Sequence, residues 1–432
     1  MATKNALAKF RIESDLWLDF RSKCEDSGQP YSSVLREFCA NYEPQKESER
    51  MLNDNNRNNQ LGLGLSHVST SKLKIVRQKV GELYSGPGGI GLGAALAEVT
   101  TEDQCWITEP SWINDFDPDS CRTWEKNVLK FEREQKGFNG EVDIRVGDVR
   151  KLPINELAAI DGLMFGFPCN DFSLVGEQKG FEGKFGPLYS YGIEILNRIP
   201  KPKWFIAENV GGITSSNEGK AFKIILEDMR SAGYTIVAHK FKFEEYGIPQ
   251  ARHRVIIVGF LEDLDLEFKV PKPSGIRMTA GQALANIPTW ATGNEHTRQA
   301  QRVVERLSHI KPGQNAWNAD LPEHLKLNVP NTKLSHIYKK LDPNQPAYTV
   351  TGSGGGGTHM YHWAENRALT NRERARLQTF PDWFEFSGTK ESVRKQIGMA
   401  IPVKGAQLIV ESVLKCLAGS RYDYVKPNIA LD

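Results

Sequence analysis

The residues best suited to chemistry follow the ends of buried stretches in the middle of the chain. Cys169 comes just after the apolar run at 159–168, before a polar loop, where a thiol is placed to act as a nucleophile. A buried structural thiol is the common alternative for a lone cysteine. Glu208 ends another apolar run, and a carboxylate there is costly unless it is used or paired. Arg252 and Arg254 alternate, so both guanidinium groups face one side, where they can hold a carboxylate and a phosphate or carbonyl.

A second group of residues predicts a nucleotide-type cofactor site. Residues 84–91 read Tyr-Ser-Gly-Pro-Gly-Gly-Ile-Gly, a turn that lets a ligand approach the backbone and that opens a helix. No Gly-Lys-Ser/Thr follows, so the turn is not a P-loop. Asp115 could accept bonds from a ribose diol, Phe116 could cover an adenine, and Asp148 could accept from an adenine amino group. A tight packing turn and helix-capping aspartates are the alternatives.

Strands that alternate with helices must position these residues. Strands are expected within 75–85, 105–116, 143–149, 159–169, 201–210 and 253–260, and helices within 86–99 and 117–135. This alternation predicts an α/β fold with a doubly wound, mostly parallel sheet. Ligands bind such sheets at the carboxyl ends of the strands, which is where the candidate residues stand.

Composition excludes several other classes of protein. The 432 residues predict two or three domains, and the net charge of +2 names no partner by itself. No apolar run approaches the ~20 residues of a membrane span, and the first residues lack the apolar run and cleavage site of a signal peptide, so we expect neither a membrane protein nor a secreted one. The six cysteines contain no C-x-x-C pair, so we expect no metal site and a reducing cytoplasm.

Together these stretches resemble a prokaryotic DNA (cytosine-5)-methyltransferase. The resemblance covers residues 74–262 and 367–405, with the family's motifs in order. They are YSGPGG, DFDPD, GD, GFPCNDFS, GEQKGFE, ENVGGI, YGIPQARHRVIIVG, RALTNRERARLQTFPD and QIGMAIP. The resemblance implies a Rossmann-like, S-adenosylmethionine-dependent methyltransferase sheet and transfer of a methyl group to carbon 5 of a cytosine in double-stranded DNA, with S-adenosylhomocysteine as product.

The resemblance also assigns roles to residues. Cys169 would add to carbon 6 of cytosine, Glu208 would bond ring nitrogen 3, and Arg254 would hold the ring oxygen and the glutamate, with Arg252 beside it. The cofactor would be held by Tyr84, Ser85, Gly86, Pro87, Gly88, Gly89, Asp115, Phe116, Asp148 and Pro168. Ser173, Gln250, Thr349 and Val350 would contact DNA. The target base must flip out of the duplex. The loop 170–190 would close over the flipped base, and the alternative is that this segment is an ordinary surface loop.

The segment before the late motifs resembles a target-recognition domain. Residues 268–348 carry eleven Lys and Arg against five Asp and Glu, and Thr349-Val350 matches the family's Thr-(Leu/Ile/Val) pair. We therefore expect a catalytic domain at 73–264, a target-recognition domain at 265–360 and a return to the catalytic domain at 361–432. Two positions depart from the family's pattern: Phe185 precedes Gly186 where Arg is frequent, and Met399 replaces an Asn.

The N-terminal 45 residues resemble a ribbon-helix-helix DNA-binding unit. Lys9 and Arg11 alternate with Phe10 and Ile12, so the basic pair would face DNA while the unit forms a homodimer. Six basic against seven acidic residues weaken this interpretation, and a packing or dimerisation appendage is the alternative. The Asn-rich stretch 46–72 predicts a linker.

The resulting functional hypothesis is the modification enzyme of a restriction-modification system. It would act in the bacterial cytoplasm at the nucleoid, beside a cognate endonuclease that it need not contact, and the N-terminal unit would also repress the enzyme's own gene. Two alternatives stay open: an RNA methyltransferase of the same fold that acts on tRNA cytosine, and a repressor with a degenerate catalytic domain.

Overall fold

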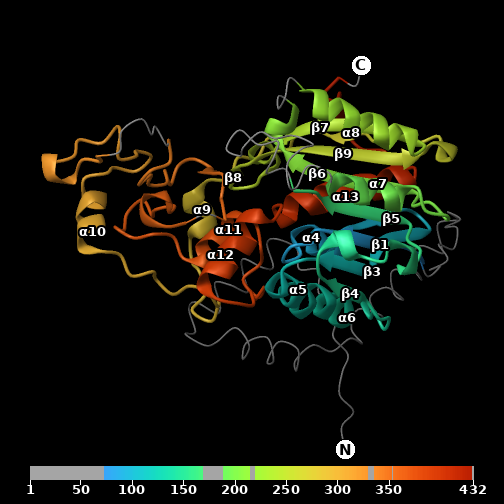
Figure 1. Ribbon diagram of the computed structural model, residues 1–432, viewed down its shortest axis with the longest axis horizontal. Helices are drawn as coiled ribbons and strands as arrows, with labels where there is room; N and C mark the ends of the chain where they lie inside the picture. Colours follow the sequence, from blue (N-terminus) through green and yellow to red (C-terminus); the bar gives the residue numbers. More distant parts are fainter. Residues whose placement is uncertain (1–72, 169–187, 215–218, 329–334, 353, 431–432) are drawn as a thin grey trace, which may run out of the picture. The chain divides into compact units, whose positions relative to one another are not determined.

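A computed structural model describes residues 73–168, 188–214, 219–328, 335–352 and 354–430. Among these residues, eight strands form one sheet in the order β2-β3-β1-β5-β6-β9-β7, with β4 beside β3 (Figure 1). The strands are β1 (Lys74–Leu83), β2 (Glu98–Thr100), β3 (Gln104–Asp115), β4 (Asp143–Val146), β5 (Gly162–Gly166), β6 (Trp204–Val210), β7 (Tyr234–Lys242) and β9 (His253–Leu261).

The sheet confirms the predicted mostly parallel arrangement. Strands β4, β3, β1, β5 and β6 run parallel. Strand β9 lies antiparallel between β6 and β7, and β2 is antiparallel to β3. The strand Tyr234–Lys242 was not among the strands expected from the sequence. Its reversed neighbour β9 carries Arg254 back toward the end of β6, which brings that arginine to Glu208.

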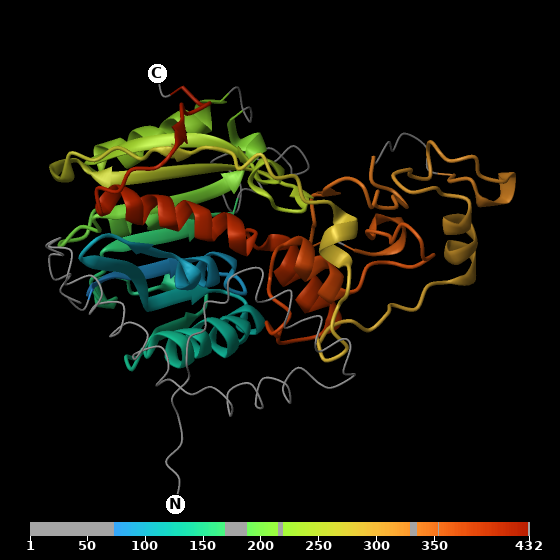
Figure 2. The ribbon, with the colours of Figure 1, turned by 180° about the vertical axis from the view of Figure 1, so that it is seen from behind.

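Helices cover both faces of the sheet. Helices α4 (Gly89–Leu96) and α13 (Val403–Leu417) lie on one face (Figure 2), and α7 (Tyr189–Leu196) and α8 (Lys220–Ser231) lie on the other. Helices α5 (Pro118–Trp124) and α6 (Lys130–Lys136) are joined by a π-helical turn at Glu125–Leu129.

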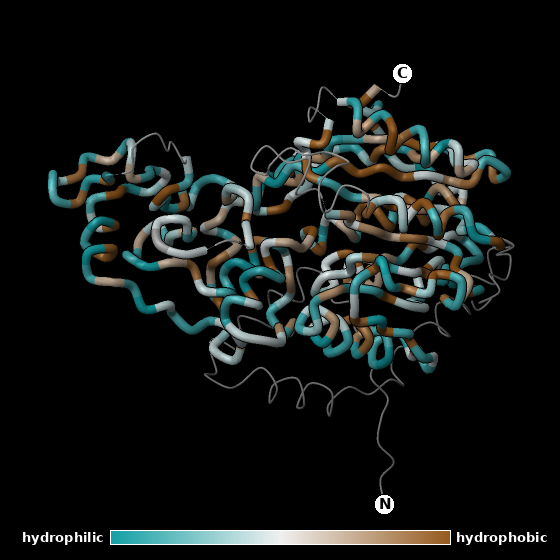
Figure 3. The backbone as a smooth tube through the Cα atoms, in the orientation of Figure 1, coloured by the Kyte–Doolittle hydropathy of each residue, from teal (hydrophilic) through white to brown (hydrophobic). Residues whose placement is uncertain are grey.

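Strand residues alternate between the two apolar cores. Met164 and Ile206 pack in the α4–α13 core, whereas Phe165 and Phe205 pack in the α7–α8 core. Because both faces of the central strands are buried, β5, β6 and β9 are apolar along most of their length, and the hydropathy colouring of Figure 3 shows such apolar stretches in the sheet.

The later part of the chain has shorter elements. They are β8 (Gln250–Ala251), β10 (Val270–Pro271), α9 (Ala280–Leu284), α10 (Gln301–Ser308), β11 (Ala347–Tyr348), α11 (Asn371–Leu377), α12 (Lys390–Met399) and β12 (Tyr424–Val425). A small core of its own gathers Leu307, Ile310, Ala316, Leu321, Tyr338, Tyr361 and Ala368. Strand β11 pairs in parallel with β8, so the residues just before Thr349 are hydrogen-bonded to those just before Arg252.

Several predictions fall outside the described residues. These are the N-terminal unit with Lys9 and Arg11, the linker, the nucleophile Cys169, the loop residue Ser173 and the Phe185-Gly186 departure. One described stretch, Lys390–Leu417, is apolar and long enough by composition to cross a membrane. Its most apolar window is 72% buried in the protein, and the stretch is divided into α12 and α13.

Candidate active site

The two residues predicted to hold the target ring form a close ion pair. Arg254 Nε lies 2.8 Å from Glu208 Oε1, and each side chain is 13% exposed. The pairing of β6 with β9 sets this distance, since Arg254 lies opposite Val210, two residues along the strand from Glu208. The second guanidinium contact of Arg254 goes to the carbonyl of His253, which fixes its direction.

The strand next to Glu208 leaves room for its second carboxylate oxygen. Glu208 stands in register with Gly166, the last residue of β5. A Cβ at position 166 would lie 3.3 Å from Glu208 Oε2, closer than most such contacts. The glycine therefore lets the carboxyl group extend over the end of β5.

A cavity of about 500 Å³ joins the ion pair to the glycine-rich turn. Glu208, Arg252 and Arg254 form part of its wall, and Pro168, the residue before Cys169, forms another part. The rest of the wall includes Tyr84, Ser85, Gly86, Gly89, Asp115, Phe116, Thr349, Val350, Lys395 and Met399. Most predicted cofactor residues and the described catalytic candidates thus line one cavity.

Asp115 shapes the glycine-rich turn. Its Oδ2 accepts from the Gly86 N–H at 2.8 Å, and its Oδ1 accepts from the Asp117 N–H at 2.9 Å. Burial raises the pKa of the Asp115 carboxyl, while these two bonds oppose the rise. Gly86 has φ +54°, and the space where its side chain would stand is open. The turn therefore presents bare backbone to the cavity.

Asp148 lies apart from the cavity wall. Its carboxylate accepts from the backbone and side chain of Arg150, and this pairing lowers the Asp148 pKa to about 2. The carboxylate is also near enough to Tyr84 to contribute to the raised pKa of that phenol, whose main cause is burial. The Tyr84 hydroxyl donates to the Leu188 carbonyl at 2.6 Å.

Arg252 and Gln250, predicted for catalysis and for DNA contact, both bind the backbone of the later part of the chain. Arg252, fully buried, donates to the carbonyls of Val350 at 3.0 Å and Met399 at 3.4 Å. Burial lowers the pKa of Arg252 well below its usual value. Gln250 has no exposed surface, and its amide oxygen accepts from the Val350 N–H at 2.8 Å. Gln250 thus has no exposed surface in this structure, and the two printed contacts of the Arg252 guanidinium go to backbone carbonyls.

Hydrogen bonds to residues 250–252 hold Thr349 and Val350 in position. The Thr349 hydroxyl donates to the Ala251 carbonyl at 2.8 Å, and both residues line the cavity. Val350 is buried, so a DNA contact at this pair falls to Thr349 or to backbone atoms.

Sequence reasoning missed Lys395. Its ammonium lies 5.3 Å from the centre of the Phe116 ring, at the cavity wall, and its charge favours the ionised form of Asp115. The signal was its place one residue before Gln396, at the start of the late QIGMAIP motif. Met399, the departure within that motif, also lines the cavity and uses its carbonyl to bind Arg252.

Comparison with known proteins decides the family. The model of the family "C-5 cytosine-specific DNA methylase" matches residues 78–415. The chain is 54% identical over 353 residues to the type II methyltransferase M.BbvI of Brevibacillus brevis, covering 79% of this chain and 92% of that protein. It is 37% identical to M.NgoFVII of Neisseria gonorrhoeae, covering 81% of this chain and 89% of that protein.

The chain belongs to the C-5 cytosine-specific DNA methylase family. It is a DNA (cytosine-5-)-methyltransferase, and its substrate is DNA. The fold agrees with an Escherichia coli prophage protein described as a DNA modification methyltransferase, with a TM-score of 0.61 at 23% identity, covering 79% of this chain and 99% of that one. Entamoeba histolytica EhMeth gives a TM-score of 0.54 at 15% identity, covering 80% of this chain and 98% of that one.

The cavity of this methyltransferase suits the S-adenosylmethionine on which the family depends. Gly86 leaves a backbone cradle, Phe116 is 59% exposed, and Asp115 lines the same cavity. These groups offer a close backbone approach, a surface for an adenine and an acceptor for hydroxyl groups.

Proposed function

We propose that this methyltransferase is the modification enzyme of a type II restriction-modification system. Its target would be a cytosine flipped out of duplex DNA, and Cys169 would form a covalent bond to that base. The names of the relatives M.BbvI and M.NgoFVII support the type II assignment. The Glu208–Arg254 pair at 2.8 Å, in a cavity that also holds the glycine-rich turn, carries the chemical part of the proposal.

The cofactor would be held by the glycine-rich turn, Asp115 and Phe116. Bound S-adenosylmethionine supplies an electrophilic methyl group. Carbon 5 of cytosine is a poor nucleophile, so the chain's own residues must activate the ring. The Cys169 thiolate would add to carbon 6 while Glu208 protonates ring nitrogen 3, which gives an enamine-like ring whose carbon 5 can take the methyl group. Loss of the proton from carbon 5 and elimination of the Cys169 thiolate would then restore the aromatic ring and free the enzyme. General acid–base catalysis of this kind typically raises a reaction rate by ~10²–10⁴-fold.

Arg254 would bind both Glu208 and the target cytosine. Its bond to Glu208 Oε1 orients the carboxyl group, which leaves Oε2, over Gly166, to face the base. The guanidinium group also offers donors for the ring oxygen. A base can reach this pair only out of the helix, at a cost of a few kcal/mol, which is the reason to propose flipping.

The test is transfer of tritiated methyl groups to plasmid DNA and, in parallel, to tRNA. We expect label in DNA alone, abolished by Cys169→Ala and unchanged by Cys416→Ala. Bisulfite sequencing of the product then gives the methylated site. Label in tRNA alone would move the enzyme to RNA, and label in neither, with DNA still bound, would leave a repressor.

Residues 1–45 carry a separate proposal from the sequence alone. The ribbon-helix-helix-like unit, with Lys9 and Arg11 toward DNA, would dimerise the enzyme and repress its own gene. The motive is a DNA-binding pattern on a linker that catalysis should not need. Deletion of residues 1–60 should abolish binding to the upstream DNA and preserve methylation, and unchanged binding would refute repression through this unit.

A further inference from the structure

Lys395 on α12 brings an ammonium group to the wall of the active-site cavity. The residue is exposed, and it lines both the large cavity and a small recess that Gly86, Asp115 and Phe116 also line. Its ammonium lies 5.3 Å from the centre of the Phe116 ring. Across the part of the chain that the structure describes, this ammonium forms no hydrogen bond or ion pair. Its donors therefore remain available to a ligand in the cavity.

Contacts of α12 with its neighbours hold the backbone of Lys395 at this wall. The buried Gln396 side chain accepts from the Thr123 hydroxyl at 2.7 Å, and Thr123 lies on α5, which begins two residues after Phe116. A Cβ at Gly352 would lie 3.1 Å from the Lys395 Cα, so the glycine lets that segment lie against the helix. The backbone is thus held beside Phe116, while the four-carbon side chain of the lysine can still rotate.

The other charged side chains that line the cavity are already engaged. Glu208 pairs with Arg254, and the Arg252 guanidinium donates to two backbone carbonyls. Both oxygens of Asp115 accept from backbone N–H groups. Among the described residues of this wall, Lys395 is therefore the exposed cation whose donors are all unused.

The cofactor on which the family depends carries a group that matches this cation. At neutral pH S-adenosylmethionine has one anionic group, the carboxylate of its amino-acid end, beside a cationic ammonium and the cationic sulfonium. A lysine ammonium attracts the carboxylate and repels the two cations. Met399, which lines the same recess, has a thioether that offers no donor to a carboxylate. The contact of Lys395 with Phe116 is weak at an exposed site and does not compete with a charged acceptor.

We propose that Lys395 binds the carboxylate of S-adenosylmethionine. The inference rests on the proposed cofactor site at the glycine-rich turn, Asp115 and Phe116, and it adds the residue that receives the amino-acid end of the ligand. An adenine on Phe116 takes the ring from the ammonium, which the rotations of the lysine side chain allow. By attracting the carboxylate and repelling the sulfonium, Lys395 also favours one orientation of the cofactor in the cavity.

Binding of two ligands without DNA tests this role. S-adenosylhomocysteine has the carboxylate, and decarboxylated S-adenosylhomocysteine keeps the amine and lacks it. By calorimetry, Lys395→Met should weaken S-adenosylhomocysteine by about tenfold, the low end for a hydrogen bond between charged groups, because the site is exposed. The affinity for the decarboxylated ligand should stay within about twofold, as for an ordinary surface substitution. Lys395→Arg should keep most of the affinity for S-adenosylhomocysteine, because it keeps the charge.

Lys390→Met is the matched control. Lys390 is an exposed lysine of the same helix, and it lines a different cavity. This variant should bind both ligands as the unchanged protein does. If Lys395→Met weakened both ligands equally, Lys395 would act through Phe116, Asp115 or the packing of α12, and the proposal would be overturned.

Phe116→Ala separates this inference from the proposed cofactor site. It should weaken both ligands, since both contain the adenine. If Phe116→Ala weakens both ligands and Lys395→Met weakens neither, the cofactor site stands and the role of Lys395 is wrong. If neither variant changes either affinity, the cofactor binds elsewhere, and the proposed cofactor site fails together with this inference.

Discussion

Arg254 on β9 contacts Glu208 on β6 through an Nε–Oε1 distance of 2.8 Å, near the end of β6, where β9 pairs with it in the antiparallel direction. The pair is largely enclosed, so water screens it little. Both residues of the pair lie on hydrogen-bonded strands, which hold them in place. The proposed contact with a planar base requires such fixed positions.

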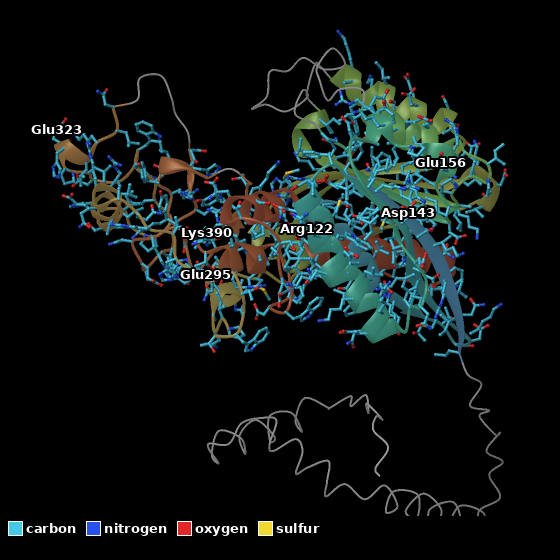
Figure 4. All side chains as sticks on the ribbon, turned by 60° about the horizontal axis from the view of Figure 1, so that its bottom comes forward. Arg122, Asp143, Glu156, Glu295, Glu323 and Lys390 are labelled. Atoms are coloured by element: carbon cyan, nitrogen blue, oxygen red, sulfur yellow. The ribbon has the colours of Figure 1, made fainter. Side chains whose placement is uncertain are left out.

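Glu208→Gln should remove the proton donor and the Arg254 ion pair while keeping the shape of the side chain. We expect kcat to fall by about 10²–10⁴-fold, the range for general acid–base assistance, with DNA affinity little changed. Single-turnover methyl transfer measures the step. Glu156→Gln, at an exposed position (Figure 4), is the control, and an equal loss there would exclude a special role for Glu208.

Gly166→Ala should act through Glu208. The added Cβ would stand 3.3 Å from Oε2, so the carboxyl group must turn. We expect kcat to fall by about tenfold or more, since small misplacements of reacting groups cost up to ~10²-fold. The double variant Gly166→Ala, Glu208→Gln should be no slower than Glu208→Gln alone. Additive losses would show that the glycine acts elsewhere.

Arg252→Lys tests a positioning role for Arg252. The substitution should weaken the contacts that join Arg252 to the backbone at Val350 and Met399. A lysine cannot serve both the Val350 and Met399 carbonyls, which the arginine reaches at 3.0 and 3.4 Å. Leaving a buried acceptor unpaired costs ~1–3 kcal/mol of unfolding free energy, measured here by urea titration. Arg122→Lys, whose side chain is 60% exposed, should change it by less than about 0.5 kcal/mol. Equal effects would contradict the positioning role.

Much of this arrangement follows from local sequence. Apolar runs predicted β5, which ends before Cys169, and also β6 and β9, which contain Glu208 and Arg254, because strands buried on both faces are apolar along most of their length. The burial of Gln250 could not be predicted, because it depends on neighbours that tertiary packing brings together.

Glu82 should make stability depend on pH. Burial raises the pKa of this carboxyl from 4.5 to about 8, although Trp124 donates to its Oε2 at 3.1 Å. The folded protein therefore keeps a proton that the unfolded chain loses above its lower pKa. The Glu82 contribution to stability is complete below pH 4.5 and is lost as the pH rises toward about 8.

Glu82→Gln should remove this dependence. Relative to the variant, the unchanged protein should lose about 1.4 kcal/mol per pH unit across that window. Urea titrations at several pH values measure the difference in unfolding free energy between the two proteins. The contributions of other titrating groups, such as Glu132, are the same in both proteins and cancel in this difference. Parallel curves for the two proteins would show that Glu82 does not keep its proton.

The two labelled residues Glu295 and Lys390, side by side in Figure 4, line a separate cavity of about 370 Å³ beside α12. Neither residue lines the cavity that holds the Glu208–Arg254 pair. Glu295→Gln should therefore leave single-turnover methyl transfer within about twofold of the unchanged enzyme, since it lies apart from the reacting groups. A larger loss would place a reacting group at this second cavity.

The most direct test of the account is covalent capture of the enzyme on duplex DNA that carries 5-fluorocytosine at the methylated site. Fluorine cannot leave carbon 5 as a proton does, so the adduct should persist through denaturing electrophoresis in the presence of S-adenosylmethionine. The account predicts capture of the unchanged enzyme and of Cys416→Ser, none with Cys169→Ser, and slow capture with Glu208→Gln. Capture that survives Cys169→Ser would contradict it.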